Sequence, residues 1–317
     1  MDGAAGKLSI VIPAYNEEGN ILRAAEAVRS EMDRAGIPAD ILFVDDGSSD
    51  GTWDRIEEAA ARDEGVRGIR FSRNFGKEAA IFAGLEMADG DCCAVMDCDL
   101  QHPPETLAEM YRLWQNGYEV VEGVKEDRGR ESLVYKGFAA LFYKLMSGAV
   151  KMDMRRASDF RLMDRRAVDA LVALPERGTF FRALSSWVGY RTATVSFRVR
   201  EREVGQSKWS PVSLVRYALR NITSFTTKPL QLVWIMGGVF LLLAVILGIV
   251  CLADYFSHRA VEGFTTVILI ELIIGALVML SLGIIGGYIA KIYEEIKGRH
   301  RYIVSQTIRL PERRRWS

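Results

Sequence analysis

The sequence predicts an α/β domain with a mainly parallel sheet, followed by a two-helix transmembrane hairpin. Over the first 125 residues, short β-branched apolar runs alternate with amphipathic helical stretches, which is the pattern of β-α-β units. Beyond about residue 228, two long apolar runs follow one another across a short polar loop. The mean hydropathy of +0.05 therefore averages a globular part and a membrane part.

The expected strands and helices of the first part alternate along the chain. The strands are Leu8–Ile12, Asp40–Val44, Val66–Phe71 and Cys92–Met96. The helices are Glu18–Ala35, Gly51–Ala61, Lys77–Met87 and Pro104–Gln115. Strands that are apolar throughout fit a sheet covered on both faces. Ligands of such sheets bind at the carboxyl ends of the strands.

Composition excludes several classes of protein. Lys and Arg (41) balance Asp and Glu (41), which argues against a nucleic-acid partner. Cys92, Cys93 and Cys98 crowd into one strand-like segment without a C-x-x-C spacing, so we expect buried thiols rather than a zinc site or a disulfide framework. The N-terminus lacks a signal-peptide pattern, and the globular part is expected in the cytosol.

Each predicted strand ends in a polar segment. These segments are Pro13–Glu17, Asp45–Thr52, Arg73–Lys77 and Asp97–Glu105. Asp-Gly-Ser by itself is a common turn and helix cap. Capping alone does not explain a polar segment after every strand at one edge of the sheet. The glycine-rich motifs of dinucleotide folds and P-loops are absent from the sequence.

The fourth segment carries oxygen ligands for a metal ion. Asp97 and Asp99 leave the strand at i and i+2, and the amide of Gln101 follows at i+4. Such hard oxygen ligands suit Mg²⁺ or Mn²⁺, which bridge a carboxylate to a substrate diphosphate. We therefore predict a metal that stabilises charge on a departing nucleotide diphosphate.

The motifs P-A-Y-N-E, D-D-G-S-S-D-G-T, R-N-F-G-K, D-C-D-L-Q-H-P-P-E, S-D-F-R-L-M-D-R and R-E-V-G-Q-S-K-W resemble those of the family 2 glycosyltransferases of GT-A fold. Among these, the chain is most similar to the polyprenyl-phosphate glycosyltransferases of the dolichyl-phosphate mannose synthase and bactoprenol glucosyltransferase type. The resemblance runs from about Leu8 to the membrane helices. It implies a donor site with the following residues: Pro13, Tyr15, Glu17 and Asp46 around the nucleoside, Lys77 nearby, Asp97 on the donor, and Asp99 and Gln101 on the metal.

Basic residues in two further segments suit a lipid phosphate acceptor. The first is Lys125–Ser132, a charged loop, which on its own is often only a solvated surface, and the second contains Arg200, Arg202 and Lys208. Arg offers paired hydrogen bonds to phosphate, and Lys adds a point charge. Together with the resemblance, this chemistry predicts an acceptor-phosphate site of Arg128, Ser132, Arg200, Arg202 and Lys208.

The resemblance also marks Asp159 as the catalytic base near the acceptor. A phosphate monoester has a second pKa of about 6, so the acceptor oxygen is already largely anionic near pH 7. Asp159 could therefore orient the acceptor or the sugar instead. A structural ion pair with Arg161 or another nearby arginine is the remaining alternative.

The apolar runs Pro229–Ala253 and Gly263–Ala290 are each long enough to span a bilayer, and only Glu271 interrupts the second. Basic residues flank the outer ends of both runs, so the positive-inside rule places the catalytic domain and both termini in the cytoplasm of a multi-pass inner-membrane protein. Glu271 either reaches toward the headgroups or fixes helix packing. Gly275, Gly283, Gly286 and Gly287 would allow close helix approach, including a homo-oligomer.

These observations divide the chain into a catalytic domain over 1–210, an interfacial helix over 211–228, two transmembrane helices over 229–292 and a basic tail over 293–317. The predicted activity is inverting transfer of a sugar, glucose from UDP-glucose, to undecaprenyl phosphate. GDP-mannose, a UDP-N-acetylhexosamine or a UDP-aminoarabinose derivative are alternative donors. A processive polysaccharide synthase is disfavoured because Q-x-x-R-W is absent. A non-catalytic nucleotide-binding scaffold is the alternative from another class.

Overall fold

The computed structural model describes residues 6–126, 157–175, 181–198, 228–256 and 263–310. The chain divides into two units. The first contains a sheet with its covering helices and includes the chain from Arg299 onward, and the second contains two long helices.

The first unit is built on one eight-stranded sheet in the order β7-β5-β6-β4-β1-β2-β3-β8. The strands are β1 Leu8–Ala14, β2 Ala39–Asp45, β3 Val66–Phe71, β4 Cys92–Val95, β5 Val120–Lys125, β6 Ala157–Asp164, β7 Thr192–Phe197 and β8 Val304–Ile308. The four strands β3, β2, β1 and β4 are parallel to one another, whereas β6 and β8 run antiparallel to the strands beside them. The predicted α/β architecture with a mainly parallel sheet is confirmed.

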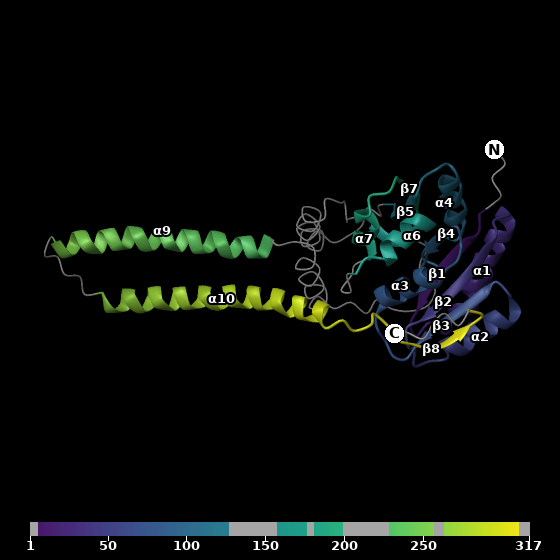
Figure 1. The fold of residues 1–317 in the computed structure, drawn as a ribbon, viewed down its shortest axis with the longest axis horizontal. Coiled ribbons are helices and arrows are strands. Elements are labelled where there is room, and N and C mark those ends of the chain that lie inside the picture. The colour runs from purple at the N-terminus through teal and green to yellow at the C-terminus, as the bar shows by residue number, and fades with distance from the viewer. Residues whose placement is uncertain (1–5, 127–156, 176–180, 199–227, 257–262, 311–317) are drawn as a thin grey trace. The chain divides into compact units, whose positions relative to one another are not determined.

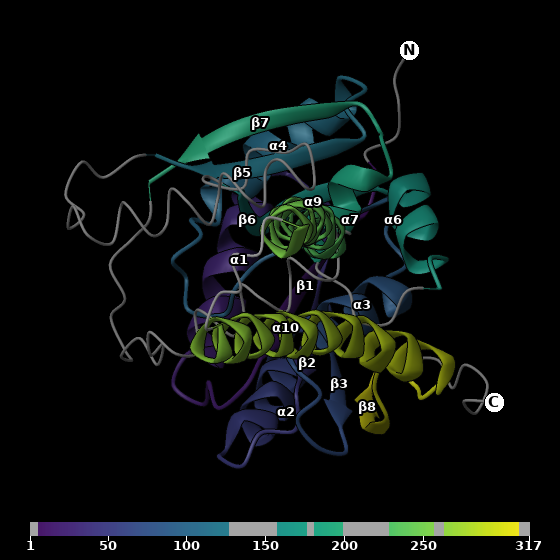
Figure 2. The same ribbon diagram turned by 90° about the vertical axis from the view of Figure 1, so that its left-hand side faces the viewer.

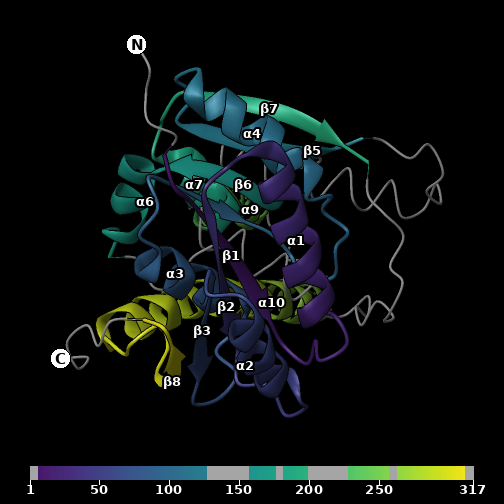
Figure 3. The same cartoon turned by 90° about the vertical axis from the view of Figure 1, so that its right-hand side faces the viewer.

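Helices cover both faces of this sheet (Figure 3). The first face carries α1 Ile21–Ala35, α2 Thr52–Arg62 and α4 Glu105–Gln115, and the second carries α3 Lys77–Met87, α6 Arg165–Val172 and α7 Phe181–Trp187. Ile10 and Ile12 of β1 share a core with residues of α1, α2 and α4. Val11 points to the opposite face, where a Cβ on Gly84 of α3 would lie 2.2 Å from a Val11 methyl carbon. Burial on both faces explains why the strands are apolar throughout.

The cysteines of this unit behave as the sequence predicts. Cys92, Cys93 and Cys98 are free thiols, and all of them are buried. Burial raises the pKa of each thiol above its ordinary value. They are therefore protonated core residues rather than nucleophiles.

The chain after the second long helix returns to the sheet. The sequence predicts a basic tail over 293–317, but β8 pairs antiparallel with β3 within this range (Figure 2). In this pairing Val304 lies opposite Phe71, and Ile308 lies opposite Gly68. The strand is short and mostly polar, so its apolar pattern is too weak to reveal it among the basic residues around it.

The second unit consists of α9 Lys228–Phe256 and α10 Phe264–Ile296, which lie side by side (Figure 1). Within the described residues, Ile273–Tyr293 is long and apolar enough to cross a membrane, while the apolar segment Ile235–Leu247 of α9 is shorter. Leu241 and Met279 are among many apolar side chains that these helices leave exposed. Exposed apolar surface of this kind indicates association with a membrane. The interfacial helix predicted over 211–228 lies, apart from Lys228, outside the described residues.

Candidate active site

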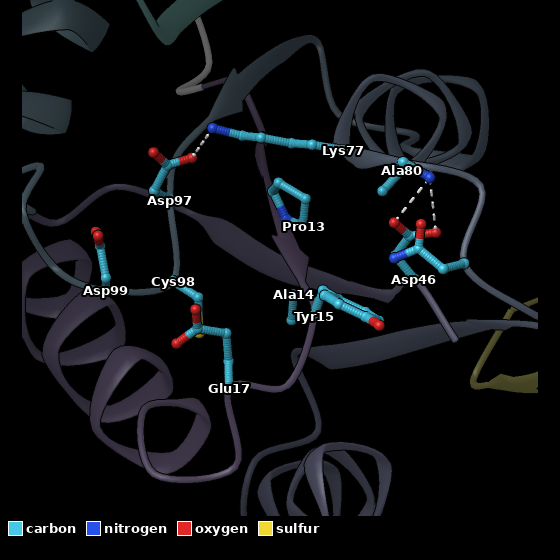
Figure 4. A pocket seen from close by; sticks show the side chains of 12 residues that line it. Pro13, Ala14, Tyr15, Glu17, Asp46, Lys77, Ala80, Asp97, Cys98 and Asp99 are labelled. Atoms are coloured by element: carbon cyan, nitrogen blue, oxygen red, sulfur yellow. Dashed lines mark hydrogen bonds and ion pairs between the residues drawn. The ribbon is translucent and has the colours of Figure 1, made fainter. Parts of the chain in front are cut away.

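A cleft with a volume of about 290 Å³ opens at the carboxyl ends of the parallel strands (Figure 4). Its lining residues come from the end of β1, from the loops after β1, β2, β3 and β4, and from the start of α3: Pro13, Ala14, Tyr15, Glu17, Asp46, Asn74, Gly76, Lys77, Ala80, Asp97, Cys98 and Asp99. Asp97 and Asp99 lie on one side of the cleft and Asp46 on the other, with Pro13 and Tyr15 between them. The residues predicted at the donor site are thus gathered in one cavity, except Gln101.

The loop after β1 is tied to the loop after β2 by side-chain hydrogen bonds. Asn16, in the left-handed conformation at φ 54°, donates its backbone N–H to Ser48 Oγ at 2.9 Å. Its side-chain Oδ1 accepts the backbone N–H of Ser49 at 2.9 Å, and the N–H of Glu17 bonds Thr52 Oγ1 at 2.9 Å. These bonds make the two loops one wall of the cleft, from which the half-exposed Tyr15 ring (46%) projects.

Asp46 connects this wall to the loop after β3. Its Oδ1 accepts the backbone N–H of Phe75 at 2.6 Å, and its Oδ2 accepts the N–H of Gly76 at 2.9 Å. Burial raises the pKa of Asp46 although both amides favour the carboxylate. Gly76 has φ 100°, a conformation that favours glycine. Asp46 therefore shapes the cleft by holding the backbone of the loop after β3. The D-D-G-S motif alone does not reveal this role.

Lys77, the first residue of α3, joins two carboxylates that the sequence assigns to different substrates. Its Nζ lies 2.5 Å from Asp97 Oδ1 and 2.8 Å from Asp159 Oδ2. Burial by itself would lower the pKa of Lys77, but the two carboxylates outweigh it and raise the pKa. In turn, the pKa of Asp97 is lowered because the lysine outweighs the effect of burial. The expected donor aspartate and the expected acceptor aspartate thus share one cation.

Asp159, on β6, also binds Arg182 of α7. Arg182 donates from Nε to Oδ1 at 2.6 Å and from Nη2 to Oδ2 at 3.0 Å. Burial opposes ionisation of Asp159, but Lys77 and Arg182 outweigh it and lower its pKa far below the ordinary range. The alternative of an ion pair with a nearby arginine is therefore present, with Arg182 rather than Arg161. Arg161 instead forms an ion pair with Glu122, with 3.1 Å between Nη2 and Oε1.

Arg182 and Glu78 belong to this cluster without any sequence signal that singles them out. Glu78 follows Lys77 on α3, and its Oε2 accepts the backbone N–H of Phe181 at 2.8 Å. Burial, and then the nearby charge of Asp159, raise the pKa of Glu78 to about 7. Glu78 thus holds the first residue of the helix that presents Arg182 to Asp159.

His102 supports the loop that carries Asp97 and Asp99. Its Nδ1 accepts the backbone N–H of Asp97 at 3.2 Å, and its ring stacks on Phe160 at 4.8 Å between centroids. Burial lowers the pKa of His102, so the neutral ring remains an acceptor for Asp97. His102 is part of the D-C-D-L-Q-H-P-P-E motif, but only the folded chain reveals what its ring contacts.

The cleft offers oxygen ligands to a divalent cation without forming a complete metal site by itself. Among the described residues, no group of three or more His, Cys, Asp or Glu side chains is arranged to hold a metal ion. Asp97 and Asp99 both line the cleft, and the backbone N–H of Gln101 bonds Asp99 Oδ1 at 3.1 Å. Mg²⁺ commonly takes one or two protein carboxylates and completes its shell with substrate phosphates and water. The residues present fit an ion bound in that way.

The predicted acceptor-phosphate residues, namely Arg128, Ser132, Arg200, Arg202 and Lys208, lie outside the described residues. The structure therefore does not test this set. Lys125 is the last residue of β5, and the charged loop that contains Arg128 and Ser132 follows it. Burial, and next the positive charge of Arg182, lower the pKa of Lys125 against the opposing effect of Asp97.

The parallel core with antiparallel β6 beside β4, and acidic residues at the end of β4, is the arrangement of the GT-A nucleotide-sugar transferases. The chain belongs to glycosyl transferase family 2, whose family model matches residues 9–171.

Relatives extend this similarity over nearly the whole chain. The chain is 38% identical to the uncharacterized glycosyltransferase YkcC of Bacillus subtilis (strain 168), over 96% of this chain and 95% of that protein. It is 36% identical to the SfII prophage-derived bactoprenol glucosyl transferase of Shigella flexneri, over 96% and 99% of the two chains. The solved glucosyl-3-phosphoglycerate synthase from Mycobacterium tuberculosis, in complex with Mg²⁺ and uridine-diphosphate, shares the fold with a TM-score of 0.51 at 19% identity, over 69% of this chain and 79% of that one.

Proposed function

We propose that this protein moves a sugar from a nucleotide diphosphate to a polyprenyl phosphate, with inversion at the anomeric carbon. One observation carries the proposal: Asp97 and Asp99 lie in a cleft at the strand ends of a family 2 glycosyltransferase. The relative named bactoprenol glucosyl transferase, similar over 96% of the chain, supports a polyprenyl carrier. It also favours glucose, and we propose UDP-glucose as the donor.

On the donor side, Tyr15 and Pro13 would contact the nucleoside, with Glu17 and Asp46 beside them. An exposed aromatic ring at a cleft wall can pack on a planar base. A divalent cation, Mg²⁺ or Mn²⁺, held by Asp99 and Gln101 near Asp97, would neutralise charge on the leaving diphosphate. Lys77 keeps Asp97 ionised and holds its carboxylate in position.

On the acceptor side, an oxygen of the lipid phosphate attacks the anomeric carbon as the bond from that carbon to the nucleotide diphosphate breaks. The attacking oxygen carries no proton that must be removed, because a phosphate monoester is largely dianionic near pH 7. Asp159 is bound by two cations and has a strongly lowered pKa, so it is a weak proton acceptor. We therefore assign Asp159 to orientation of the acceptor or the sugar, with Arg128, Ser132, Arg200, Arg202 and Lys208 as candidate ligands of the phosphate.

A lipid acceptor requires the site to meet a membrane. We propose that both α9 and α10 span it as a hairpin, with 211–228 as an interfacial helix. Arg216 and Arg220 precede α9, Lys228 is its first residue, and Lys297 and Arg299 follow α10. Basic residues at these ends favour a cytoplasmic catalytic domain in the inner membrane. Gly283 and Gly287 would support helix contacts in a homo-oligomer, to which Glu271 could contribute.

A donor panel tests the proposal directly. Purified full-length protein in detergent is incubated with undecaprenyl phosphate, Mn²⁺ and UDP-glucose, GDP-mannose, a UDP-N-acetylhexosamine or a UDP-aminoarabinose derivative. The lipid fraction is then analysed by mass spectrometry. We expect a hexosyl phosphate lipid from UDP-glucose, and no product with EDTA. A product from another donor alone corrects the sugar, whereas nucleotide binding without any lipid product indicates a non-catalytic scaffold.

A further inference from the structure

The segment that follows α10 packs against β3, and the loop after β3 lines the donor cleft. The ring of Tyr302 stacks on Phe71 with 5.0 Å between centroids and an interplanar angle of 14°. Its hydroxyl donates to Glu86 Oε2 at 2.6 Å. The next residue, Ile303, accepts the backbone N–H of Ser72 at 2.9 Å. Tyr302 is 5% exposed, so this contact is part of the core of the catalytic unit.

A short chain of contacts leads from Tyr302 to the cleft. Phe71 also meets Phe75 edge-on, with 5.7 Å between ring centroids. Phe75 and the neighbouring Gly76 donate their backbone N–H groups to Asp46, and Gly76 lines the cleft. The loop 72–76 is thus held at one end by Tyr302 and Ile303 and at the other by Asp46.

Neighbouring contacts fix the returning segment in place. The guanidinium of Arg301 lies 4.6 Å from the centre of the Phe82 ring, and its Nη2 donates to the carbonyl of Leu174 at 2.7 Å. β8 then covers the outer side of β3, which would otherwise be an edge strand with unpaired backbone groups. Some contacts of this segment join residues more than 200 positions apart in sequence, for example Arg70 with Gln306.

We propose that Tyr302 is a positioning residue for the donor site. In this role, Tyr302 and the strand that follows it hold loop 72–76 in the conformation that lets Asp46, Gly76 and Lys77 shape the cleft. The segment after the second membrane helix therefore has a function in donor binding besides anchoring. This inference rests on the proposed donor site.

The test compares three variants of the full-length protein in detergent. Tyr302→Ala removes the stacking, and Tyr302→Phe keeps the stacking but loses the bond to Glu86. Gln306→Ala removes an exposed contact of β8, the strand that follows Tyr302, and serves as a matched control. Affinity for the nucleoside diphosphate that wild type binds is measured with Mn²⁺ by calorimetry, alongside KM values for donor and acceptor. We expect Tyr302→Ala to weaken nucleotide binding and raise donor KM about tenfold with acceptor KM unchanged. Tyr302→Phe and Gln306→Ala should stay near wild type.

A second measurement needs no variant. If Tyr302 couples to the donor site, then nucleotide must in turn stabilise the contacts of Tyr302, because coupling between sites is reciprocal. Hydrogen exchange of wild type should slow at 72–76 and at 302–308 when nucleotide is added. Unchanged exchange at 302–308 despite bound nucleotide, or an unaltered affinity of Tyr302→Ala, overturns the inference. Failure of wild type to bind any nucleotide instead overturns the proposed function.

Discussion

Replacing Gly47 with alanine measures how much the cleft depends on close contact between the loops after β2 and β3. Gly47 has φ 65°, and a Cβ added there would lie 2.3 Å from the carbonyl carbon of Arg73 and 2.7 Å from its Cα. Both are backbone atoms, so no side-chain rotation can relieve the overlap. The substitution must therefore displace the loop that Asp46 binds through Phe75 and Gly76.

Two costs add at Gly47. A residue with a Cβ in the left-handed conformation costs about 1–2 kcal/mol. Forcing extra volume into a packed contact costs about a further 1–3 kcal/mol. Gly36, at the end of α1, is a matched control because it has the same φ of 65° with nothing within 4 Å of the added Cβ. Gly36→Ala should show only the first cost, so the difference between the variants isolates the contact with Arg73.

Both variants are assayed as full-length protein in detergent by thermal unfolding and by steady-state kinetics. We expect Gly36→Ala to lower the melting temperature by about 2–8 °C, the equivalent of its cost of about 1–2 kcal/mol, with donor KM unchanged. Gly47→Ala should lower the melting temperature further, by about 2–4 °C for each additional kcal/mol in a domain of this size. Its donor KM should rise about tenfold, equivalent to about 1.4 kcal/mol. Equal melting temperatures and equal donor KM values for the two variants would refute the reasoning.

Substitutions at four other positions test separate parts of the site. Asp99→Ala should lower the transfer rate by about 100-fold, or about 2.7 kcal/mol, because the metal loses a ligand; full activity of this variant in EDTA contradicts the metal assignment. Lys77→Met should reduce kcat, since Asp97 and Asp159 lose their shared cation, and Lys77→Arg should recover part of it. Glu78→Gln should raise the melting temperature above that of wild type at pH 8 but not at pH 4.5. The reason is that the pKa of the Glu78 carboxyl is about 7 in the folded state, whereas its ordinary value is 4.5, so wild type loses stability as the pH rises from 4.5 to 7. The same difference in melting temperature at both pH values would contradict this prediction. Arg202→Ala, outside the described residues, should raise acceptor KM and leave nucleotide affinity unchanged, and an equal loss of both would move Arg202 to the donor side.

The strands and helices of the catalytic unit follow from local pattern. Apolar runs such as Leu8–Ala14 form strands because they are buried on both faces, and the polar residues after them meet at one edge because the strands are parallel. The cleft residues from Pro13 to Asp99 could be grouped on that basis alone. Their catalytic roles stay predictions.

The contacts within the site depend on strand order, which no local pattern specifies. β6 is inserted beside β4, and this brings Asp159 to Lys77 across 82 positions of sequence and to Arg182 of α7. The same applies to Asp46, whose carboxylate binds backbone amides about 30 positions later. A sequence reveals that these residues are charged, but not which partner neutralises each charge.

The amino-acid sequence by itself determined the fold class and the chemical character of the cleft, because apolar periodicity and turn residues act over short distances. Its motifs also indicated the family, by resemblance. Tertiary structure alone decided that Asp159 is held by Lys77 and Arg182, that Glu78 supports the helix carrying Arg182, and that β8 completes the sheet beside β3. The physical reason is that a short polar strand or a buried charge is stable only in the presence of its partner. That partner lies far away in the chain and comes into contact only when the sheet is assembled.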